Sequence, residues 1–262
     1  MLKKCVAWLA LAAVLMGAAP LPAVAQTIPD TKEFSIAAKG AVVIDAGSGR
    51  VYFAQNANGR LPMASTTKIM TALLALEQPD LDEPFVVDSA AIRVEGTSMG
   101  LKEGDTVTLR TLAHGMLLPS GNDAANAAAV RIAGSKDAFA ELMNEKAREL
   151  GLEDTHYVTP SGLDADGHYS SAYDLAILAA YALENPDFRE ICCKESAKVE
   201  FGNPPYGRWL KNHNKLLNLY PYAIGVKTGY TDDAKRCLVT AAQKDGVTLI
   251  AVTLAAQDGF NV

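Results

Sequence analysis

Two residues at the start of an amphipathic segment have side chains that could perform nucleophilic catalysis. In MASTTKIMTALLALE, residues 63–77, Ser65 and Lys68 stand three positions apart. Residues with this spacing share one face of a helix, so the Lys68 amine could contact the Ser65 hydroxyl and remove its proton. The structural alternative is that Ser65 caps the helix while Lys68 faces solvent. That alternative explains Ser65 well, but it leaves a cation near the positive end of the helix dipole.

Two further polar motifs follow in the sequence. Ser120-Gly121-Asn122 stands between a proline and a helical pattern in LLPSGNDAAN, and Lys227-Thr228-Gly229 lies on a strand pattern in GVKTGYT. A lysine can supply charge, a hydroxyl can supply hydrogen bonds, and a glycine lets a substrate backbone approach closely. Each motif alone can be structural, the first as a turn with a helix cap and the second as the end of an edge strand. Their combination with the Ser-x-x-Lys pattern favours a catalytic site.

In this order the three motifs resemble those of the active-site serine penicillin-recognising enzymes. Four segments are similar to the low-molecular-mass D-alanyl-D-alanine carboxypeptidases: PMASTTKIMTALL, LLPSGNDAA, GLDADGHYSSAYDLA and GVKTGYT. The resemblance extends over nearly the whole chain after its first 37 residues. It implies an enzyme that removes the terminal D-alanine from peptidoglycan stem pentapeptides through a serine acyl-enzyme and so limits cross-linking. It also implies acylation by penicillins and other β-lactam antibiotics.

The resemblance implies a role for each motif residue. Ser65 would be the nucleophile, and Lys68 would be its base, kept neutral by burial and by the nearby Lys227 cation. Ser120 would relay the proton to the leaving amine. The backbone N–H groups of Ser65 and Tyr230 would form the oxyanion hole. The substrate would be bound by Asn122, Lys227, Thr228 and Gly229, and no metal or organic cofactor would be needed.

Asn122 would contact the peptide chain of the substrate, and Lys227 with Thr228 would hold its terminal carboxylate. Some members of the family place an arginine for that carboxylate on the final strand, but VTLIAVTLAA has no counterpart. Carboxylate recognition is therefore expected to depend more on Lys227 and Thr228. A glycine common in the family near Lys235 is also absent, which leaves the conformation of that turn open.

Two alternative functions remain at this point. A class A β-lactamase shares the motif order, but it carries Ser-Asp-Asn where this chain has Gly121. It also uses a loop glutamate in a Glu-x-x-x-Asn pattern, whereas LEDTHYVTPSGLDADG contains Glu153 without that pattern. The other alternative is a catalytically silent peptidoglycan-binding protein on the same scaffold.

The first 25 residues have the pattern of a secretory signal peptide. Lys3 and Lys4 form a positive start, VAWLALAAVLMGAA is an apolar run, and AVA before Gln26 is a small-x-small cleavage site. The run is shorter than the roughly 20 apolar residues that a membrane span needs. We expect residues 1–25 to be a signal peptide and the protein to be exported, to the periplasm or the outer face of the cytoplasmic membrane and cell wall.

Residues 26–262 are expected to form the catalytic domain. By resemblance, the family's domain continues past its last strand into a closing helix, often followed by a β-rich domain and an amphipathic tail. We expect this sequence to lack the final helix and any C-terminal domain. Peripheral membrane association would then depend on a tail outside these 262 residues.

Charge and cysteine content limit other functions. The net charge is −6, and removal of Lys3 and Lys4 would make it −8, so we expect no nucleic-acid partner. Cleavage would leave Cys192, Cys193 and Cys237, for which free buried thiols are favoured, with a bond between one of the adjacent pair and Cys237 as the alternative. The sequence contains no Cys/His cluster with zinc spacing, so no metal site is expected.

Strand patterns occupy both ends of the chain, and helical patterns occupy the middle. β-type runs cover a hairpin at 40–56, short segments at 84–88 and 105–109, and three later segments at 223–229, 236–243 and 247–255. Helical patterns cover residues 63–77, 111–118, 123–134, 135–151 and 171–185. A polar stretch and WLKNHNKLLNLYP follow, to which no element is assigned.

This order of elements excludes a doubly wound parallel sheet, in which strands and helices alternate regularly. The predicted fold class is α+β. One antiparallel sheet would join the first hairpin to the last three strands, flanked by helices and interrupted by an inserted helical lobe, as in the β-lactamase/transpeptidase-like fold. The three motifs would meet in the cleft between the lobe and the sheet.

Overall fold

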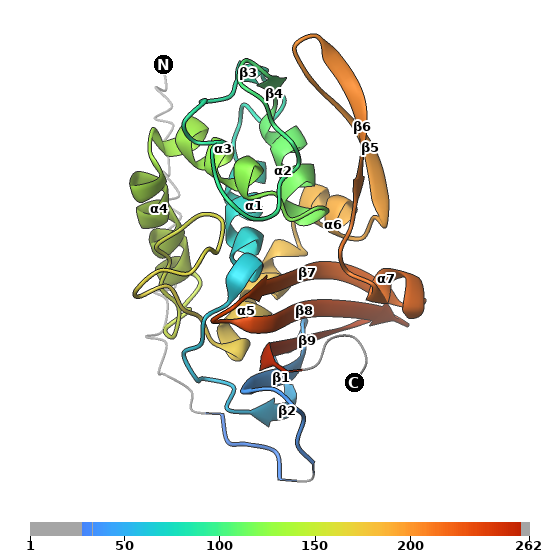
Figure 1. Ribbon diagram of the computed structural model, residues 1–262. Coiled ribbons are helices and arrows are strands. Elements are labelled where there is room, and N and C mark those ends of the chain that lie inside the picture. The colour runs from blue at the N-terminus through green and yellow to red at the C-terminus, as the bar shows by residue number, and fades with distance from the viewer. Residues whose placement is uncertain (1–27, 33, 258–262) are drawn as a thin grey trace, which may run out of the picture.

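A five-stranded antiparallel sheet forms the base of the molecule (Figure 1). The computed structural model describes residues 28–32 and 34–257, so the expected signal peptide at 1–25 lies outside the described residues. The strand order is β2-β1-β9-β8-β7. The bounds are β1 Gly40–Asp45, β2 Val51–Gln55, β7 Ala223–Thr231, β8 Lys235–Lys244 and β9 Val247–Ala256.

The sheet confirms the predicted pairing of the two ends of the chain. Strand β1 pairs with β9 in a register that sets Val42 opposite Val252 and Ile44 opposite Ile250, and all four side chains are buried. Strands β8 and β9 are joined through Asp245-Gly246, a turn sequence suited to a tight hairpin. The first hairpin therefore closes against the last strands, and the helical middle is an insertion between them.

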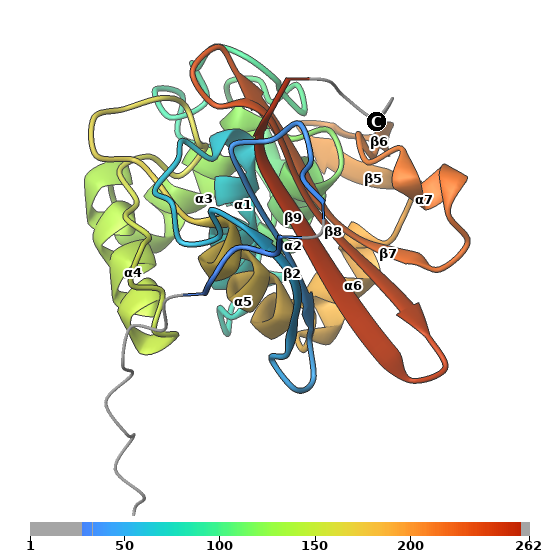
Figure 2. The same cartoon turned by 90° about the horizontal axis from the view of Figure 1, so that it is seen from below.

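The helices lie on one face of the sheet, as Figure 2 shows for α1, α5 and α6 behind the strands. Helix α5 packs on β1 and β9, and α6 packs on β7. The lobe consists of α2, α3 and α4 with the two-stranded β3–β4 ribbon. The bounds are α1 Lys68–Leu76, α2 Leu109–Leu117, α3 Asn122–Ala133, α4 Lys136–Glu149, α5 Ala172–Ala182, α6 Pro186–Cys192, β3 Phe85–Val86 and β4 Thr106–Val107.

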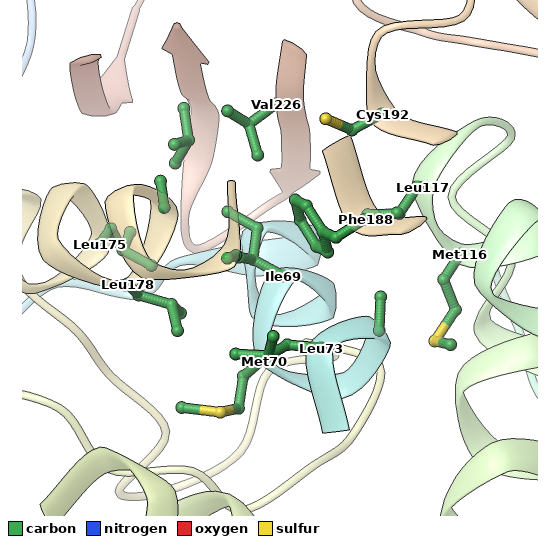
Figure 3. Close-up of a cluster of buried hydrophobic side chains, with 14 of the residues drawn as sticks. Ile69, Met70, Leu73, Met116, Leu117, Leu175, Leu178, Phe188, Cys192 and Val226 are labelled. Carbon is green, nitrogen blue, oxygen red and sulfur yellow. The ribbon is translucent and has the colours of Figure 1, made fainter. Parts of the chain in front are cut away.

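Helix α1 is the central element of the core. Every one of its residues is buried, which is typical of a helix surrounded on all sides by other elements. In Figure 3, Ile69, Met70 and Leu73 of α1 point into a cluster that also receives Phe188 from α6 and Leu175 from α5. The first turn of α1 is therefore held by packing from several elements, which limits the motion of any side chain that starts there.

Among the described residues, the structure contains four elements that the sequence analysis did not assign. They are helix α6, the two hairpin strands β5 (Ser196–Gly202) and β6 (Pro205–Lys211), and the short helix α7 (Leu216–Leu219). The hairpin stands beside the lobe rather than in the main sheet, and most of its side chains are not buried. Because few of its positions face a core, it lacks the clear apolar alternation that identifies a strand.

The turn before β8 forms without the glycine that is common in the family near Lys235. Lys235 adopts a φ of +56°, in the left-handed region that glycine enters without strain. The turn is held on its other side by Thr231, whose hydroxyl accepts the Ala234 N–H at 3.0 Å and donates to Asp164 at 2.9 Å. The turn therefore forms with a lysine at the strained position.

Candidate active site

Ser65 and Lys68 meet in a tight turn at the start of the central helix. Ser65 lies in a 3-10 turn, Ala64–Thr67, and Lys68 is the first residue of α1. The Lys68 Nζ atom donates to Ser65 Oγ at 2.7 Å, to Asn122 Oδ1 at 2.7 Å and to the Ser161 carbonyl at 2.6 Å. The lysine is fully buried, so its amine has protein partners in place of water.

These contacts contradict the structural alternative for the motif. Ser65 does not cap the helix, because it lies within the 3-10 turn, and the N-cap positions of that turn and of α1 are Met63 and Thr67. Lys68 does not face solvent, since its exposed fraction is 0%. The hydroxyl and the amine instead lie within hydrogen-bonding distance at the base of an accessible cavity.

The backbone of this turn is strained and closely supported. Ala64 has a φ of +48°, and Gly162 packs so tightly on it that a Cβ on Gly162 would lie 2.0 Å from the Ala64 carbonyl oxygen. Thr67 Oγ1 donates to the same carbonyl at 2.8 Å and lies 2.9 Å from His168 Nε2. Because His168 Nδ1 accepts the Val158 N–H at 2.9 Å, Nε2 carries the hydrogen and donates to Thr67. Burial lowers the pKa of His168 to about 4, so this histidine supports the turn as a neutral group.

The Ser120-Gly121-Asn122 motif lies where the sequence analysis placed it, at the start of α3. Ser120 adopts a φ of +64°, and its carbonyl accepts the Thr97 hydroxyl at 2.6 Å. The Asn122 N–H donates to the Thr97 carbonyl at 2.7 Å, and Asn122 Nδ2 donates to the Glu95 carbonyl at 2.8 Å. This last bond turns Asn122 Oδ1 toward Lys68. The segment 95–101, named here the 95–101 loop, therefore fixes the orientation of the motif.

Asp123 anchors the 95–101 loop and was not recognised from the sequence. Its buried carboxylate accepts the Ser98 hydroxyl at 2.6 Å and the N–H groups of Met99, Gly100 and Leu101 at 2.9–3.0 Å. An acidic residue in the first turn of a helix usually indicates only a favourable dipole interaction. The sequence therefore offered a signal for a helix start but none for a loop anchor.

Strand β7 brings the third motif to the site along the edge of the sheet. Lys227 is 1% exposed, and its Nζ donates to the Thr228 carbonyl at 2.9 Å. A Cβ on Gly229 would lie 3.0 Å from the Ser65 nitrogen, so the glycine allows β7 to approach the nucleophile turn closely. Tyr230 follows directly on the strand. The expected contribution of its N–H to an oxyanion hole stays a prediction.

Burial and charge shift the pKa values of both lysines downward. The pKa of Lys68 falls well below its usual value, first because burial disfavours the ammonium and second because the Lys227 charge repels it. Asp123 opposes this shift. Burial alone lowers the pKa of Lys227 to about 7. The pair can therefore hold a neutral amine at Lys68 beside a cation at Lys227.

A cavity of about 460 Å³ lies above these groups. Ser65, Ser120, Asn122, Thr228 and Gly229 line it, so the structure brings residues of all three motifs to one space. Among the described residues, 28–32 and 34–257, no aspartate or glutamate lines it. Glu153, the acid considered for a β-lactamase mechanism, is exposed and does not line the cavity.

Arg236 and His213 also line the cavity, and the sequence analysis assigned neither to the site. In the β7–β8 register Arg236 lies opposite Tyr230, and its guanidinium carbon is 5.5 Å from the centre of that ring. Side chains of paired residues point to the same face of a sheet, and Thr228 shares the face of Tyr230. A guanidinium and the Thr228 hydroxyl therefore face the same side of the strand. The arginine comes from β8, not from the final strand that was searched.

The remaining expectations concern thiols, metals and membranes. Cys192 and Cys237 are buried and free, whereas Cys193 is free but exposed, which corrects the expectation that all three are buried. Within residues 28–32 and 34–257, His, Cys, Asp and Glu side chains form no group that could hold a metal ion. Within the same described part of the chain, no helix is long and apolar enough to cross a membrane.

The model of the D-alanyl-D-alanine carboxypeptidase family matches residues 25–258. The chain belongs to this family. It is 37% identical to the D-alanyl-D-alanine carboxypeptidase DacF of Bacillus subtilis, over 97% of this chain and 67% of that protein. It is 41% identical to DacB2 of Mycobacterium tuberculosis, over 80% of this chain and 72% of that protein. The carboxypeptidase function predicted from the motifs is confirmed.

Solved structures confirm the fold class as well. The Streptomyces DD-transpeptidase superposes with a TM-score of 0.80 at 33% identity, covering 88% of this chain and 93% of that one. A D-alanyl-D-alanine carboxypeptidase from Mycobacterium tuberculosis gives a TM-score of 0.81 at 37% identity, covering 90% and 88%. The predicted α+β fold, with its antiparallel sheet and helical lobe, is the fold of these penicillin-recognising enzymes.

The burial of Lys227 leads to a prediction about stability. Because its folded pKa is lowered from 10.5 to about 7, the folded state binds fewer protons than the unfolded chain between these pH values. The resulting penalty is fully present below about pH 7 and disappears as the pH rises through 10.5. Lys227→Met should therefore raise the free energy of unfolding by about 1–3 kcal/mol near pH 6–7.

Denaturant unfolding between pH 6 and 10 checks this expectation, and the advantage of Lys227→Met should shrink as the pH rises. Lys136→Met removes an exposed lysine and is the matched control, for which little change is expected at any pH. A Lys227→Met protein that is less stable than the wild type near pH 6 would show that the buried ammonium is better compensated than its single hydrogen bond indicates.

Proposed function

We propose that Ser65 is the nucleophile of the carboxypeptidase reaction and that Lys68 is its general base. The observation that carries this proposal is the buried Lys68 amine, which lies 2.7 Å from both Ser65 Oγ and Asn122 Oδ1. With its pKa lowered, the neutral amine keeps two N–H groups for Asn122 and Ser161, and its lone pair can accept the Ser65 proton as the hydroxyl attacks the carbonyl of the penultimate D-alanine. The products are an acyl-enzyme and free D-alanine, and water then releases the shortened peptide.

We assign the remaining motif residues to proton transfer and substrate binding. Ser120 passes the proton to the leaving amine, and Asn122 contacts the peptide chain of the substrate. The N–H groups of Ser65 and Tyr230 stabilise the oxyanion, supported by the close approach of Gly229 to Ser65. The substrates in this proposal are peptidoglycan stem peptides that end in D-Ala-D-Ala, with β-lactams as acylating inhibitors.

In this proposal the terminal carboxylate is bound on the face of β7 that carries Thr228, whose side chain supplies a hydroxyl. Lys227 is buried on the opposite face and does not line the cavity, so it attracts the carboxylate through its positive charge. Arg236, on the same face as Thr228, adds a guanidinium that can bind a carboxylate with two donors. A carboxypeptidase must recognise this group, because the group distinguishes the chain end from an internal peptide bond.

We further propose that the enzyme acts outside the cytoplasm, with residues 1–25 as its export signal. The positive start, apolar run and cleavage pattern of that segment support this location. Peptidoglycan lies outside the cytoplasmic membrane, so export is needed for the enzyme to reach its substrate.

The nucleophile can be tested by intact-mass spectrometry with a penicillin, followed by peptide mapping. We expect a long-lived adduct on Ser65, because no carboxylate from the described part of the chain lines the cavity to activate water for its hydrolysis. Ser65→Ala should form no adduct, and Lys68→Ala should form it at least about 10³-fold more slowly. Ser48→Ala, in the exposed β1–β2 turn, is the control and should behave as the wild type. Rapid penicillin consumption with a transient adduct would instead favour a β-lactamase.

Carboxylate recognition can be tested with Arg236→Gln. We expect KM for a peptide ending in D-Ala-D-Ala to rise about tenfold while kcat changes little, since a charge-assisted contact is lost outside the reacting atoms. The rise in KM should be absent for the same peptide with an amidated C-terminus. Lys235→Gln changes the neighbouring exposed cation and is the control. An equal rise in KM for both peptides would show that Arg236 does not recognise the carboxylate.

The pH dependence of kcat/KM should be bell-shaped. At low pH, protonation of Lys68 removes the base, and above about 7 the free enzyme loses the Lys227 charge that holds the carboxylate. The two limbs belong to the coupled pair rather than to one residue. In Lys227→Arg the guanidinium stays charged, so the alkaline limb should move upward. Stopped assays of D-alanine release from pH 5 to 10 measure both profiles, and an unmoved alkaline limb would exclude Lys227 as its source.

A further inference from the structure

The 95–101 loop is held from two sides, and only one of them belongs to the active-site lobe. On the inner side, Asp123 accepts the N–H groups of Met99, Gly100 and Leu101. On the outer side, Arg208 of the β5–β6 hairpin donates from Nη1 to the carbonyl of Met99 at 3.2 Å and to the carbonyl of Gly100. The backbone of one short segment is therefore bound through its N–H groups on one side and its carbonyls on the other.

Arg208 is itself held in place by aromatic side chains of its own hairpin. Its guanidinium carbon lies 4.7 Å from the centre of the Phe201 ring and 4.4 Å from that of Tyr206. Among residues 28–32 and 34–257, it forms no ion pair with a carboxylate. Cation–π contacts orient a guanidinium without neutralising it, so its donors stay directed at the loop carbonyls.

The contact between Arg208 and the loop carbonyls depends on a glycine at position 100. Its φ is +87°, and a Cβ at this position would lie 2.5 Å from Arg208 Nη1. A side chain there would displace the guanidinium from the carbonyls. The loop thus has a conformation and a residue that permit the close approach of Arg208.

The 95–101 loop in turn fixes the conformations of Ser120 and Asn122. Ser120 is a non-glycine residue at a φ of +64°, a conformation that is unfavourable unless surrounding contacts impose it. Thr97 supplies two of these contacts, one to the Ser120 carbonyl and one to the Asn122 N–H. Glu95 fixes the Asn122 amide so that its oxygen accepts from Lys68. Two sets of hydrogen bonds, joined by the backbone of the 95–101 loop, therefore connect Arg208 to the Lys68 amine.

We propose that Arg208 is a positioning residue for the reaction, which holds Ser120 and Asn122 in place through the 95–101 loop. The proposal rests on the catalytic and binding roles proposed above for these two residues. Arg208 does not line the cavity, so it makes no contact that would directly bind substrate. Its loss should slow acylation more than it weakens substrate binding, because the binding role of Asn122 is shared with other residues.

The test compares Arg208→Met, which keeps an apolar stem beside the two rings, with the wild type. We expect kcat for D-alanine release and the rate of Ser65 acylation by penicillin to fall about tenfold, with KM rising by a smaller factor because Asn122 also contacts the substrate. Hydrogen exchange of the amides at 99–101 and Asn122 should accelerate about tenfold, while exchange in α5 stays as in the wild type. Lys211→Met, an exposed lysine of the same hairpin, is the matched control and should change none of these quantities.

A double-mutant cycle with Thr97→Val separates an effect through the loop from an independent effect. If Arg208 acts through the loop, Arg208→Met should slow acylation much less in the Thr97→Val background than in the wild type. Fully additive effects would overturn the proposal. Should Arg208→Met fail to fold, Arg208→Lys keeps the cation but presents a single nitrogen and serves in the same cycle.

The exchange measurement needs no activity, so it separates this proposal from the proposed function. Wild-type protein that neither releases D-alanine nor reacts with penicillin would count against the proposed function alone. Unchanged exchange of the 99–101 amides in Arg208→Met would overturn the role of Arg208, whatever the activity of the wild type.

Discussion

The arrangement of the site depends on keeping the Lys68 amine buried away from water. Burying an ammonium without partners is costly, so Lys68 requires both acceptors and a lowered pKa. The acceptors are Ser65 Oγ, Asn122 Oδ1 and the Ser161 carbonyl, which come from three different segments of the chain. Each segment must hold its acceptor within hydrogen-bonding distance, because movement of any one would leave the buried amine incompletely bonded. The supporting contacts around the site can be understood from this requirement.

Much of that support comes from residues that never reach a substrate. Gly162 and His168 fix the strained carbonyl of Ala64, so the Ser65 turn cannot relax away from Lys68. Asp123 and Arg208 fix the loop that orients Asn122. These contacts stabilise backbone conformations with positive φ angles, which are unfavourable when unsupported. The site is thus maintained by surrounding structure that compensates for local strain.

The sequence predicted features that depend on local spacing. The three motifs and the strands at both ends each follow from a few neighbouring residues. The sheet pairing followed because few other arrangements could join strands at the two ends. The β5–β6 hairpin was not predicted, because only a few of its side chains, such as Phe201 and Leu210, reach the core, and the others carry little periodic signal.

The missed site residues share a different cause. Arg236 was overlooked because the search for a carboxylate-binding arginine was confined to the final strand, whereas register places the β8 residue opposite Tyr230. Ser161 contributes only a carbonyl, which every residue has, so no side-chain pattern could identify it. Backbone groups and cross-strand neighbours become visible only when the long-range pairing is known.

Because successive side chains of β7 point to opposite faces of the sheet, the strand has two separate roles. Lys227 and Gly229 lie opposite the buried Val239 and Cys237, on the face that meets the Ser65 turn, whereas Thr228 and Tyr230 lie opposite Leu238 and Arg236. One face therefore lowers the pKa of the base and admits the nucleophile turn, and the other presents donors to a carboxylate. A slip of one residue would exchange these faces, placing a threonine against the turn and exposing the lysine. The pairing of β7 with β8 along nearly its whole length, at the edge of the sheet, is consequently a requirement for catalysis as well as for folding.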